Sequence, residues 1–179
     1  MSIDQIRFED DGIFFSDYPF RGASVHPTGL LLYLDIREID STKMPPEIVT
    51  YDGEVLFVHP THTQRLSQAA QAHSIPDVAH YDVWAELLTA FLDTTYDFDA
   101  EEETFARLAA VGIDRALSEE IRVYINEPLL WYNKTSTWQH MSHYDALMAI
   151  NAYTGFRLPD EEMIDLYWWT MDIAAYALV

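Results

Sequence analysis

The hydrophobic pattern changes near Pro60, and this change limits the folds open to the chain. Before Pro60, short runs rich in β-branched, aromatic and leucine residues alternate with Gly, Pro and Asp, which is typical of strands. These runs are residues 13–15, 30–39, 47–51 and 54–58. From Thr61 onward the pattern becomes helical. We therefore predict an α+β fold: a single domain, 1–179, with a small antiparallel sheet in a β-rich part, 1–60, and a bundle of about six helices in a helical part, 61–179.

Turn and capping residues set the expected boundaries. Asp52-Gly53 predicts a two-residue hairpin with a type I′ turn, which needs positive φ at both central residues. Capping boxes predict helix starts, and glycines predict helix ends. The boxes are Thr61 with Gln64, Asp99 with Glu102 and Ser136 with Gln139, and the glycines are Gly112, after a helix at 101–111, and Gly155, after a helix at 139–153. Further helices are expected at 82–92, at 119–132 with a kink or end at Pro128, and at 160–178.

The charge is strongly unbalanced. Thirty acidic residues face ten basic ones, which gives a formal net charge of −20, and both halves of the chain share the excess. Such a field repels phosphate backbones and anionic membranes and attracts basic proteins. Hydrophobic residues make up 49% of the chain, which is too apolar for a disordered acidic tail. Direct nucleic-acid binding is therefore not expected, whereas a basic partner or simple solubility is.

The densest acidic cluster is Asp97, Asp99, Glu101, Glu102 and Glu103. Alternating carboxylates suggest calcium, but the EF-hand pattern fails because it requires glycine where Glu102 stands. The cluster lies at an expected helix start, where the helix dipole favours negative charge. Helix-end electrostatics is therefore the structural interpretation, and contact with a basic partner is the functional one.

Histidine spacing raises the question of a metal. His140 and His143 are three residues apart in a predicted helix and would share a face. They do not form H-E-x-x-H, a third ligand would have to come from elsewhere, and the chain has no cysteine. We favour ordinary histidines and expect no cofactor, with a site at His140 and His143 as the alternative.

The usual catalytic motifs are missing. The glycines are too widely spaced for a P-loop or a dinucleotide fingerprint, and no G-x-S-x-G or cysteine nucleophile is present. Abundant carboxylates do not themselves indicate catalysis, because the distance between two of them in space decides their chemistry. We therefore favour a non-enzymatic role.

Aromatic residues gather late in the chain, and Trp168 and Trp169 lie in a strongly apolar run at 163–179. This run is under 20 residues long and contains Asp165 and Asp172, so we expect no membrane span. Its rings either fill the core or anchor a partner. Without cysteines, and with an acidic start that lacks an apolar signal core, the chain is expected in the cytoplasm.

Two segments carry a resemblance. PPEIVTYDGEVLFV at 45–58 and VWAELLTAFLDTTYDFDAEEETFARLAAVGI at 83–113 are similar to small acidic bacterial proteins of uncharacterised function. The similarity covers about a third of the chain and contains no catalytic motif. It implies a bacterial cytoplasmic protein and carries no activity.

Together these patterns predict a non-enzymatic acidic binding protein that neutralises or holds a basic protein, as an immunity protein or inhibitor does, or mimics a nucleic acid. The expected contacts are Asp97, Asp99, Glu101, Glu102 and Glu103, with Trp168 and Trp169 as anchors. The alternative is a carboxylate-based or metal-assisted hydrolase or lyase.

Overall fold

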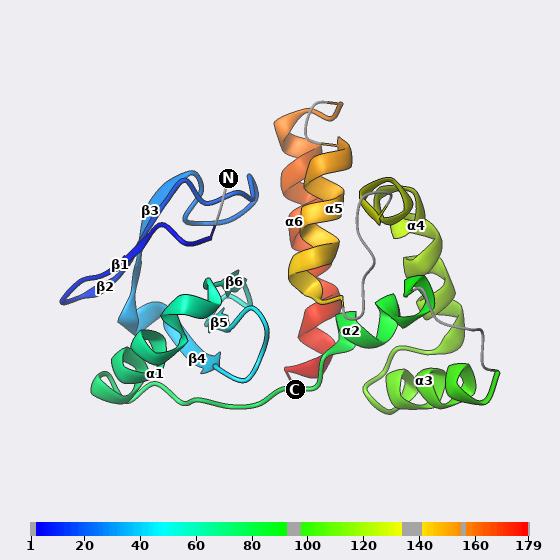
Figure 1. Cartoon of the computed structure of the whole chain (residues 1–179), viewed down its shortest axis with the longest axis horizontal. Coiled ribbons are helices and arrows are strands. Elements are labelled where there is room, and N and C mark those ends of the chain that lie inside the picture. Colours follow the sequence, from blue (N-terminus) through cyan, green and yellow to red (C-terminus); the bar gives the residue numbers. More distant parts are fainter. Residues whose placement is uncertain (1–2, 93–97, 134–140, 155–156, 179) are drawn as a thin grey trace. The chain divides into compact units, whose positions relative to one another are not determined.

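The computed structural model describes residues 3–92, 98–133, 141–154 and 157–178 (Figure 1). Two three-stranded antiparallel sheets lie in the N-terminal half, and helices make up most of the rest. The predicted α+β class is confirmed, with the strands divided between two sheets. Within these described stretches, no helix has the length and apolar character needed to cross a membrane.

The first sheet follows chain order. Its strands are β1 Ile6–Phe8, β2 Gly12–Ser16 and β3 Thr28–Leu32. Ile13 of the central strand pairs with Phe8 on one side and with Leu31 on the other. Ile13 and Phe15 are fully buried, as expected for alternate residues on the inner face of a strand. The strand predicted at 13–15 is confirmed.

The second sheet also follows chain order. Its strands are β4 Ile36–Asp40, β5 Glu47–Thr50 and β6 Val55–Phe57. The single strand predicted at 30–39 is wrong, because the 3-10 turn η1, Tyr33–Asp35, ends β3 and starts β4 in a different sheet. Every residue of β5 and β6 is buried. Since successive side chains point to opposite faces, both faces of this hairpin are covered.

The hairpin between β5 and β6 forms as predicted, but its turn is not type I′. The Thr50 N–H donates to the Glu54 carbonyl at 2.9 Å, which leaves three residues in the loop. Gly53 has φ +83°, whereas Asp52 has no positive φ, and the Gly53 N–H donates to the Thr50 carbonyl at 3.1 Å. This is the three-residue pattern of a type I turn followed by a glycine bulge.

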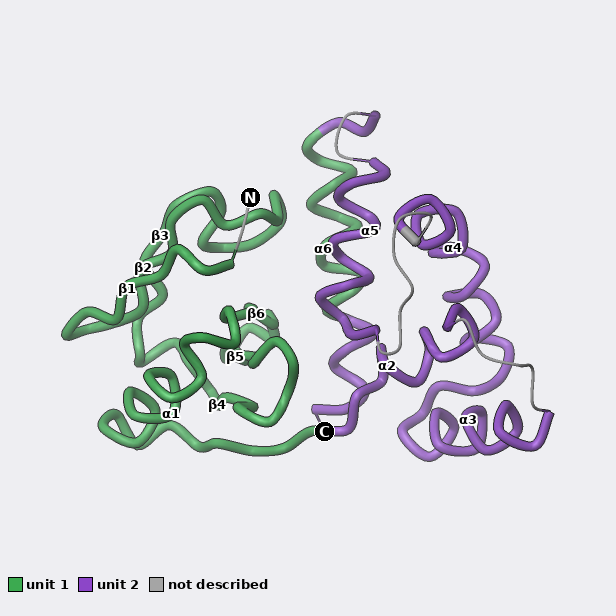
Figure 2. Tube along the Cα trace, in the orientation of Figure 1, with its two compact units in different colours: residues 1–80, 160–171 green, residues 81–159, 172–179 purple. Residues whose placement is uncertain are grey.

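The chain forms two compact units (Figure 2). Unit 1 comprises Met1–His80 and Asp160–Met171, and unit 2 comprises Tyr81–Pro159 and Asp172–Val179. Unit 1 therefore contains both sheets, helix α1, Thr63–Ala72, and most of helix α6, Asp160–Ala174. The expected single domain with parts at 1–60 and 61–179 stays a prediction.

Aromatic rings form the centre of unit 1. Phe15, Tyr18, Phe20 and Phe57 follow one another edge-on, with successive ring centroids 5.3, 5.6 and 6.0 Å apart. Tyr167 of α6 joins this chain 6.4 Å from Phe20. Such edge contacts add to the stabilisation that comes from burying the rings. A helix from the end of the sequence thus completes the core formed by its beginning.

Unit 2 is helical. Its helices are α2 Val83–Leu88, α3 Phe98–Ala110, α4 Arg115–Asn133 and α5 His143–Thr154. The core is formed by Trp84, Leu87, Leu108, Ile113 and Ile125, which are all at most 1% exposed. The 3-10 turns η3, Thr89–Phe91, and η4, Ala175–Ala177, extend α2 and α6.

Gly112 ends α3 as predicted. Its φ is +97°, a conformation that other residues adopt at a cost. The Gly112 N–H donates to the Ala109 carbonyl at 3.1 Å, and the Ile113 N–H donates to the Leu108 carbonyl at 3.0 Å. Leu108 and Ile113 are both fully buried. These are the bonds and the apolar pair of a Schellman motif. The predicted stop at Gly155 lies outside the described residues.

Two of the expected helix starts are wrong. The Thr61 and Gln64 capping box does not form, because residues 60–62 make a 3-10 turn, η2, capped by His59, and α1 follows without a side-chain cap. The helix containing Asp99 already starts at residue 98, which places Asp99 in the first turn rather than at the cap. The box of Ser136 and Gln139 lies outside the described residues.

Helix α4 differs most from expectation. It begins four residues earlier than predicted, because the Asp114 carboxylate accepts a 2.8 Å hydrogen bond from the Leu117 N–H and caps the first turn. It continues through Pro128 to residue 133, so the helix does not end at Pro128, and the kink expected as the alternative stays a prediction. Glu119 and Glu120 consequently lie beyond the first turn, where the helix dipole no longer accounts for their charge.

Candidate functional site

The acidic residues of α3 have arginine partners in unit 2. Glu101 lies 3.8 Å from Arg122, and Glu102 pairs with Arg115. Glu103 lies 3.7 Å from Arg107, one helical turn further on. Asp99 is exposed in the first turn of α3, and Asp97 lies outside the described residues.

These arginines link α3 to its neighbours. The guanidinium groups of Arg115 and Arg122 lie 4.1 and 4.8 Å from the ring centroid of Phe105, which is buried on α3. Arg122 also donates from Nε to the Leu87 carbonyl of α2 at 3.0 Å. Burial lowers the pKa of Arg122 below its ordinary value, although Glu101 opposes this shift. Glu101 therefore links α3 to α4 through the partly buried Arg122, and Arg115 and Arg107 offset part of the charge of Glu102 and Glu103.

The two tryptophans proposed as anchors lie on α6. Trp168 and Trp169 are half-buried and belong to unit 1, whereas the acidic cluster on α3 belongs to unit 2. The Trp168 ring packs edge-on against Tyr167 at 5.8 Å. The acidic contacts and the tryptophan anchors of the proposed binding site therefore belong to different units.

His143 is 2% exposed and stacks on Trp84, with ring centroids 5.4 Å apart and an interplanar angle of 9°. This contact packs α5 against α2. His140 lies outside the described residues. Within the part of the chain that the structure describes, no group of three or more His, Asp or Glu side chains is placed to hold a metal ion. In the described part of the chain, His143 therefore has a packing role. The alternative metal site at His140 and His143 stays a prediction.

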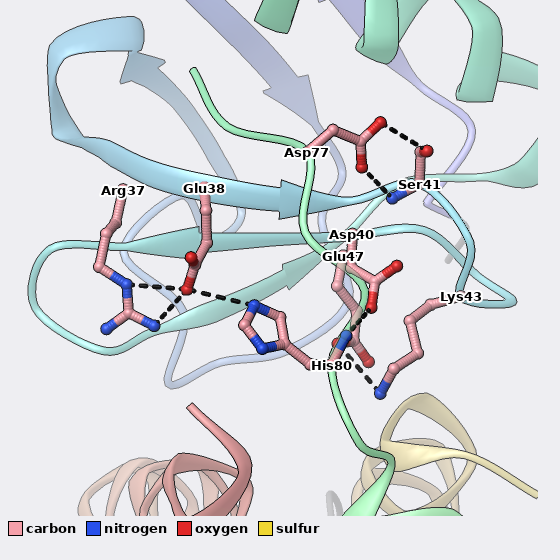
Figure 3. Close-up of polar contacts among 8 residues, drawn as sticks. All are labelled: Arg37, Glu38, Asp40, Ser41, Lys43, Glu47, Asp77 and His80. Carbon is pink, nitrogen blue, oxygen red and sulfur yellow. Dashed lines mark hydrogen bonds and ion pairs between the residues drawn. The ribbon is translucent and has the colours of Figure 1, made fainter. Parts of the chain in front are cut away.

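A polar cluster that sequence reasoning missed lies along β4 (Figure 3). Glu38 accepts hydrogen bonds from Arg37 at 2.9 Å from Nε and 2.5 Å from the terminal nitrogen. The same carboxylate oxygen lies 3.3 Å from His80 Nε2, in a contact without hydrogen-bond geometry. The Glu38 and His80 side chains are only 14% and 13% exposed.

Asp40 is the fully buried member of this cluster (Figure 3). Its carboxylate accepts from the Thr42 N–H at 2.9 Å, the Thr42 hydroxyl at 2.5 Å and the His80 N–H at 2.8 Å. Burial alone would raise the pKa of Asp40, but these hydrogen bonds outweigh it and hold the pKa below its ordinary value.

Two further carboxylates of the cluster, Asp77 and Glu47, also have partners within the chain. Asp77 accepts from the Ser41 N–H at 3.0 Å and from the Ser41 hydroxyl at 2.7 Å, and Lys43 lies 3.6 Å from Glu47. The cluster holds residues 77–80 against β4. The charged residues at three of the five positions of β4, Arg37, Glu38 and Asp40, were its signal in the sequence.

A second buried carboxylate lies in unit 1. Glu54 is 2% exposed and accepts from the Ser24 N–H at 2.9 Å, the Ser24 hydroxyl at 2.5 Å and the Tyr167 phenol at 2.8 Å. Burial, together with the nearby Tyr18 and Glu54, raises the pKa of Tyr167 well above its ordinary value. Tyr167 is therefore a fixed donor at neutral pH, and the network joins α6 to the β5–β6 hairpin.

Helix α4 presents an apolar face to solvent. Val123, Tyr124, Leu130 and Trp131 are 77%, 58%, 54% and 46% exposed. Their spacing of one, seven and eight residues places them on one side of the helix. Ile121, Ile125 and Leu129 form the opposite, buried side, with spacing that marks it as the core face. This second periodicity is the signal that would have identified the exposed face from the sequence.

The C-terminal end of this face is ordered by side-chain contacts. Trp131 packs edge-on against Tyr153 of α5, with ring centroids 6.3 Å apart. The Tyr153 phenol donates to Glu127 at 2.7 Å, and the Arg157 guanidinium lies 4.6 Å from the Tyr153 ring centroid. The exposed Trp131 ring is therefore held in place before any partner binds.

The described basic side chains are all engaged within the chain. Those in ion pairs are Arg7, Arg21, Arg37, Lys43, Arg107, Arg115 and Arg122. Arg65 and Arg157 lie over the rings of Phe8 and Tyr153. Only Lys134 among the ten basic residues lies outside the described stretches. Since thirty acidic residues face these ten, the negative excess cannot be neutralised internally.

Comparison with known proteins gives no further indication of function, because no protein-family model, curated protein or solved structure matches this chain.

Proposed function

We propose that this chain is a non-enzymatic acidic protein of the bacterial cytoplasm that binds and neutralises a basic protein, in the manner of an immunity protein or inhibitor. The observation that supports the proposal best is the engagement of all nine described basic side chains in internal contacts. A chain with net charge −20 then attracts cations to its surface and offers few cationic groups to an acidic partner.

Binding proceeds in two stages. The negative field first raises the rate of encounter with a basic surface, and aromatic anchors then dock into that surface. Asp97, Asp99, Glu101, Glu102 and Glu103 remain the proposed acidic contacts, with Trp168 and Trp169 as anchors. The arginine partners of Glu101, Glu102 and Glu103 reduce the contribution of this cluster to the long-range field.

One form of this function is mimicry of a nucleic acid, in which carboxylates occupy the partner's phosphate sites. A partner bound in this way also binds duplex DNA, so excess DNA displaces the acidic protein. A partner that holds DNA and the acidic protein together uses a different surface for each.

The test is affinity capture from a lysate of the organism that encodes the chain, run at low salt and at about 0.5 M salt, where screening shortens the range of charge interactions to a few ångströms. We expect one basic protein to be retained in both conditions. The matched bait carries Glu161→Lys and Glu162→Lys, two exposed changes that leave the core intact. Many basic proteins at low salt and none at high salt would mean non-specific attraction and would refute the proposal.

A further inference from the structure

We propose that the exposed face of α4 is the docking surface for a basic amphipathic helix of the partner protein. This inference rests on the proposed function; it adds a second contact surface to the acidic residues and tryptophans named above, and it specifies the partner element. We call the surface the α4 face and define it by the four apolar side chains Val123, Tyr124, Leu130 and Trp131 and the three acidic ones Glu119, Glu120 and Glu127.

The α4 face differs from the other exposed apolar positions. Leu34, Met44 and Tyr51 are 73%, 65% and 68% exposed and lie in turns or loops, whereas Phe98 on α3 and Ile164 on α6, at 60% and 40%, are single exposed positions on their helices. Single exposed apolar residues of this kind are normal, whereas several large ones on one side of a helix indicate an interaction surface. On α4, by contrast, four large apolar side chains share one helical side.

The dimensions of the face suit a helix. From Glu119 to Trp131 it spans just over three helical turns, or about 18 Å. Its apolar residues form two pairs, Val123 with Tyr124 and Leu130 with Trp131, separated by about two turns. A partner helix with apolar residues at i, i+3, i+4 and i+7 can contact both pairs, because its positions i and i+7 are the same two turns apart. An extended strand repeats every two residues and does not match this spacing.

The charges on the α4 face determine the sign of the charge that a partner helix must carry. Glu119 and Glu120 lie at its N-terminal end and Glu127 lies between the apolar pairs, and all three are exposed. A second copy of this chain, related by twofold symmetry, would bring like glutamates together between two proteins of charge −20. Lysine and arginine residues flanking the apolar side of a partner helix meet these glutamates instead.

Trp131 provides the fixed anchor. Tyr153 holds the edge of its ring, and Glu127 and Arg157 hold Tyr153. Because the ring is already ordered, binding costs little side-chain entropy at this position. Tryptophan and tyrosine are also the residues most enriched among those that contribute most to binding energy.

The experiment uses the full chain and a fluorescein-labelled synthetic peptide of about 18 residues, made of leucine and lysine with helical amphipathic spacing. A scrambled peptide of the same composition, whose leucines share no helical side, is the control for charge. Fluorescence anisotropy measures both dissociation constants. We expect the amphipathic peptide to bind at least about tenfold more tightly than the scrambled one.

The test variant is Val123→Ser with Leu130→Ser, which removes apolar contact and leaves the net charge unchanged. The matched control is Leu34→Ser with Tyr51→Ser, two positions of similar exposure in unit 1. We expect about tenfold weaker binding of the amphipathic peptide by the test variant and wild-type affinity for the control variant. Circular dichroism confirms that both variants are folded.

The outcomes separate this inference from the proposed function. Equal binding of the two peptides, or wild-type affinity in the test variant, would overturn docking on α4 while leaving the attraction to a basic partner intact. A concentration-dependent dimer in sedimentation velocity that the test variant abolishes would also overturn it, because the occupant would then be a second copy. Failure of the affinity capture with peptide binding intact would count against the proposed function alone.

Discussion

The phenol of Tyr167 donates a 2.8 Å hydrogen bond to the carboxylate of Glu54, a residue 113 positions earlier in the chain. The two side chains belong to unit 1 and are 3% and 2% exposed. Ser24 contributes two further donors to the same carboxylate. A buried charge with this number of donors is stabilised, whereas loss of one donor leaves part of it unsatisfied. The contact therefore fastens α6 to the β5–β6 hairpin.

Tyr167→Phe should destabilise the protein by about 1–3 kcal/mol, since the ring still packs but the Glu54 oxygen loses a donor inside the core. Urea denaturation followed by circular dichroism measures the free energy of unfolding. The control, Tyr51→Phe, alters a side chain that is 68% exposed and should leave the midpoint unchanged. Equal midpoints for the two variants would contradict the role of this hydrogen bond.

Asp40→Asn should lower stability at pH 7 by about 1–3 kcal/mol, because an amide cannot accept all three hydrogen bonds that the carboxylate receives. The pKa of Asp40 is held below its ordinary value of 3.8, so ionised Asp40 stabilises the fold above about pH 4 and this contribution is lost as the pH falls further. The variant should therefore lose less stability than wild type below pH 4. An equal loss of stability with falling pH in the two proteins would argue against this account.

Arg122→Met should destabilise unit 2 by about 1–3 kcal/mol, because the Leu87 carbonyl and Glu101 each lose a donor or cation in partly buried surroundings. Arg7→Met removes an exposed ion pair with Glu9 and should change stability by less than about 0.5 kcal/mol. Thermal unfolding of the two variants measures the contrast. A larger loss for Arg7→Met would show that the α3 arginine pairs do not stabilise unit 2.

Tyr81 gives an alkaline test. Burial raises its pKa to about 12, with Glu86 adding to the shift and Arg107 opposing it. The unfolded chain ionises this tyrosine near pH 10, so wild-type stability falls between pH 10 and 12. In Tyr81→Phe part of that loss should disappear, whereas Tyr51→Phe should behave as wild type. The measurement is the change in melting temperature between pH 9 and pH 11 in each of the three proteins. An identical alkaline decrease in all three proteins would refute the assignment to Tyr81.

Local signals predicted much of the fold. The Asp52-Gly53 turn placed the β5–β6 hairpin, and Gly112 ended α3, because both depend on backbone preferences within a few residues. The same signals missed the break at η1, since Leu30 to Ile39 reads as one apolar run and only pairing with two different sheets divides it.

Contacts between distant residues could not be predicted. Nothing in one sequence pairs Glu54 with Tyr167, or Glu102 with Arg115, because each pair depends on how separate elements pack. The α4 face is an intermediate case. The periodicity of its apolar residues can be read from the sequence. However, the predicted helix began at residue 119 instead of at Arg115, so the first turn of α4 was missed.

The most direct test of the central claim is the association rate constant of the captured basic partner, measured by stopped-flow fluorescence over a range of salt concentrations. We expect a rate that falls steeply as salt increases and a weaker dependence in the Glu161→Lys, Glu162→Lys variant, because steering by the negative field produces the dependence. A rate independent of salt, and equal in the variant, would contradict an acidic protein that uses its charge to bind a basic partner.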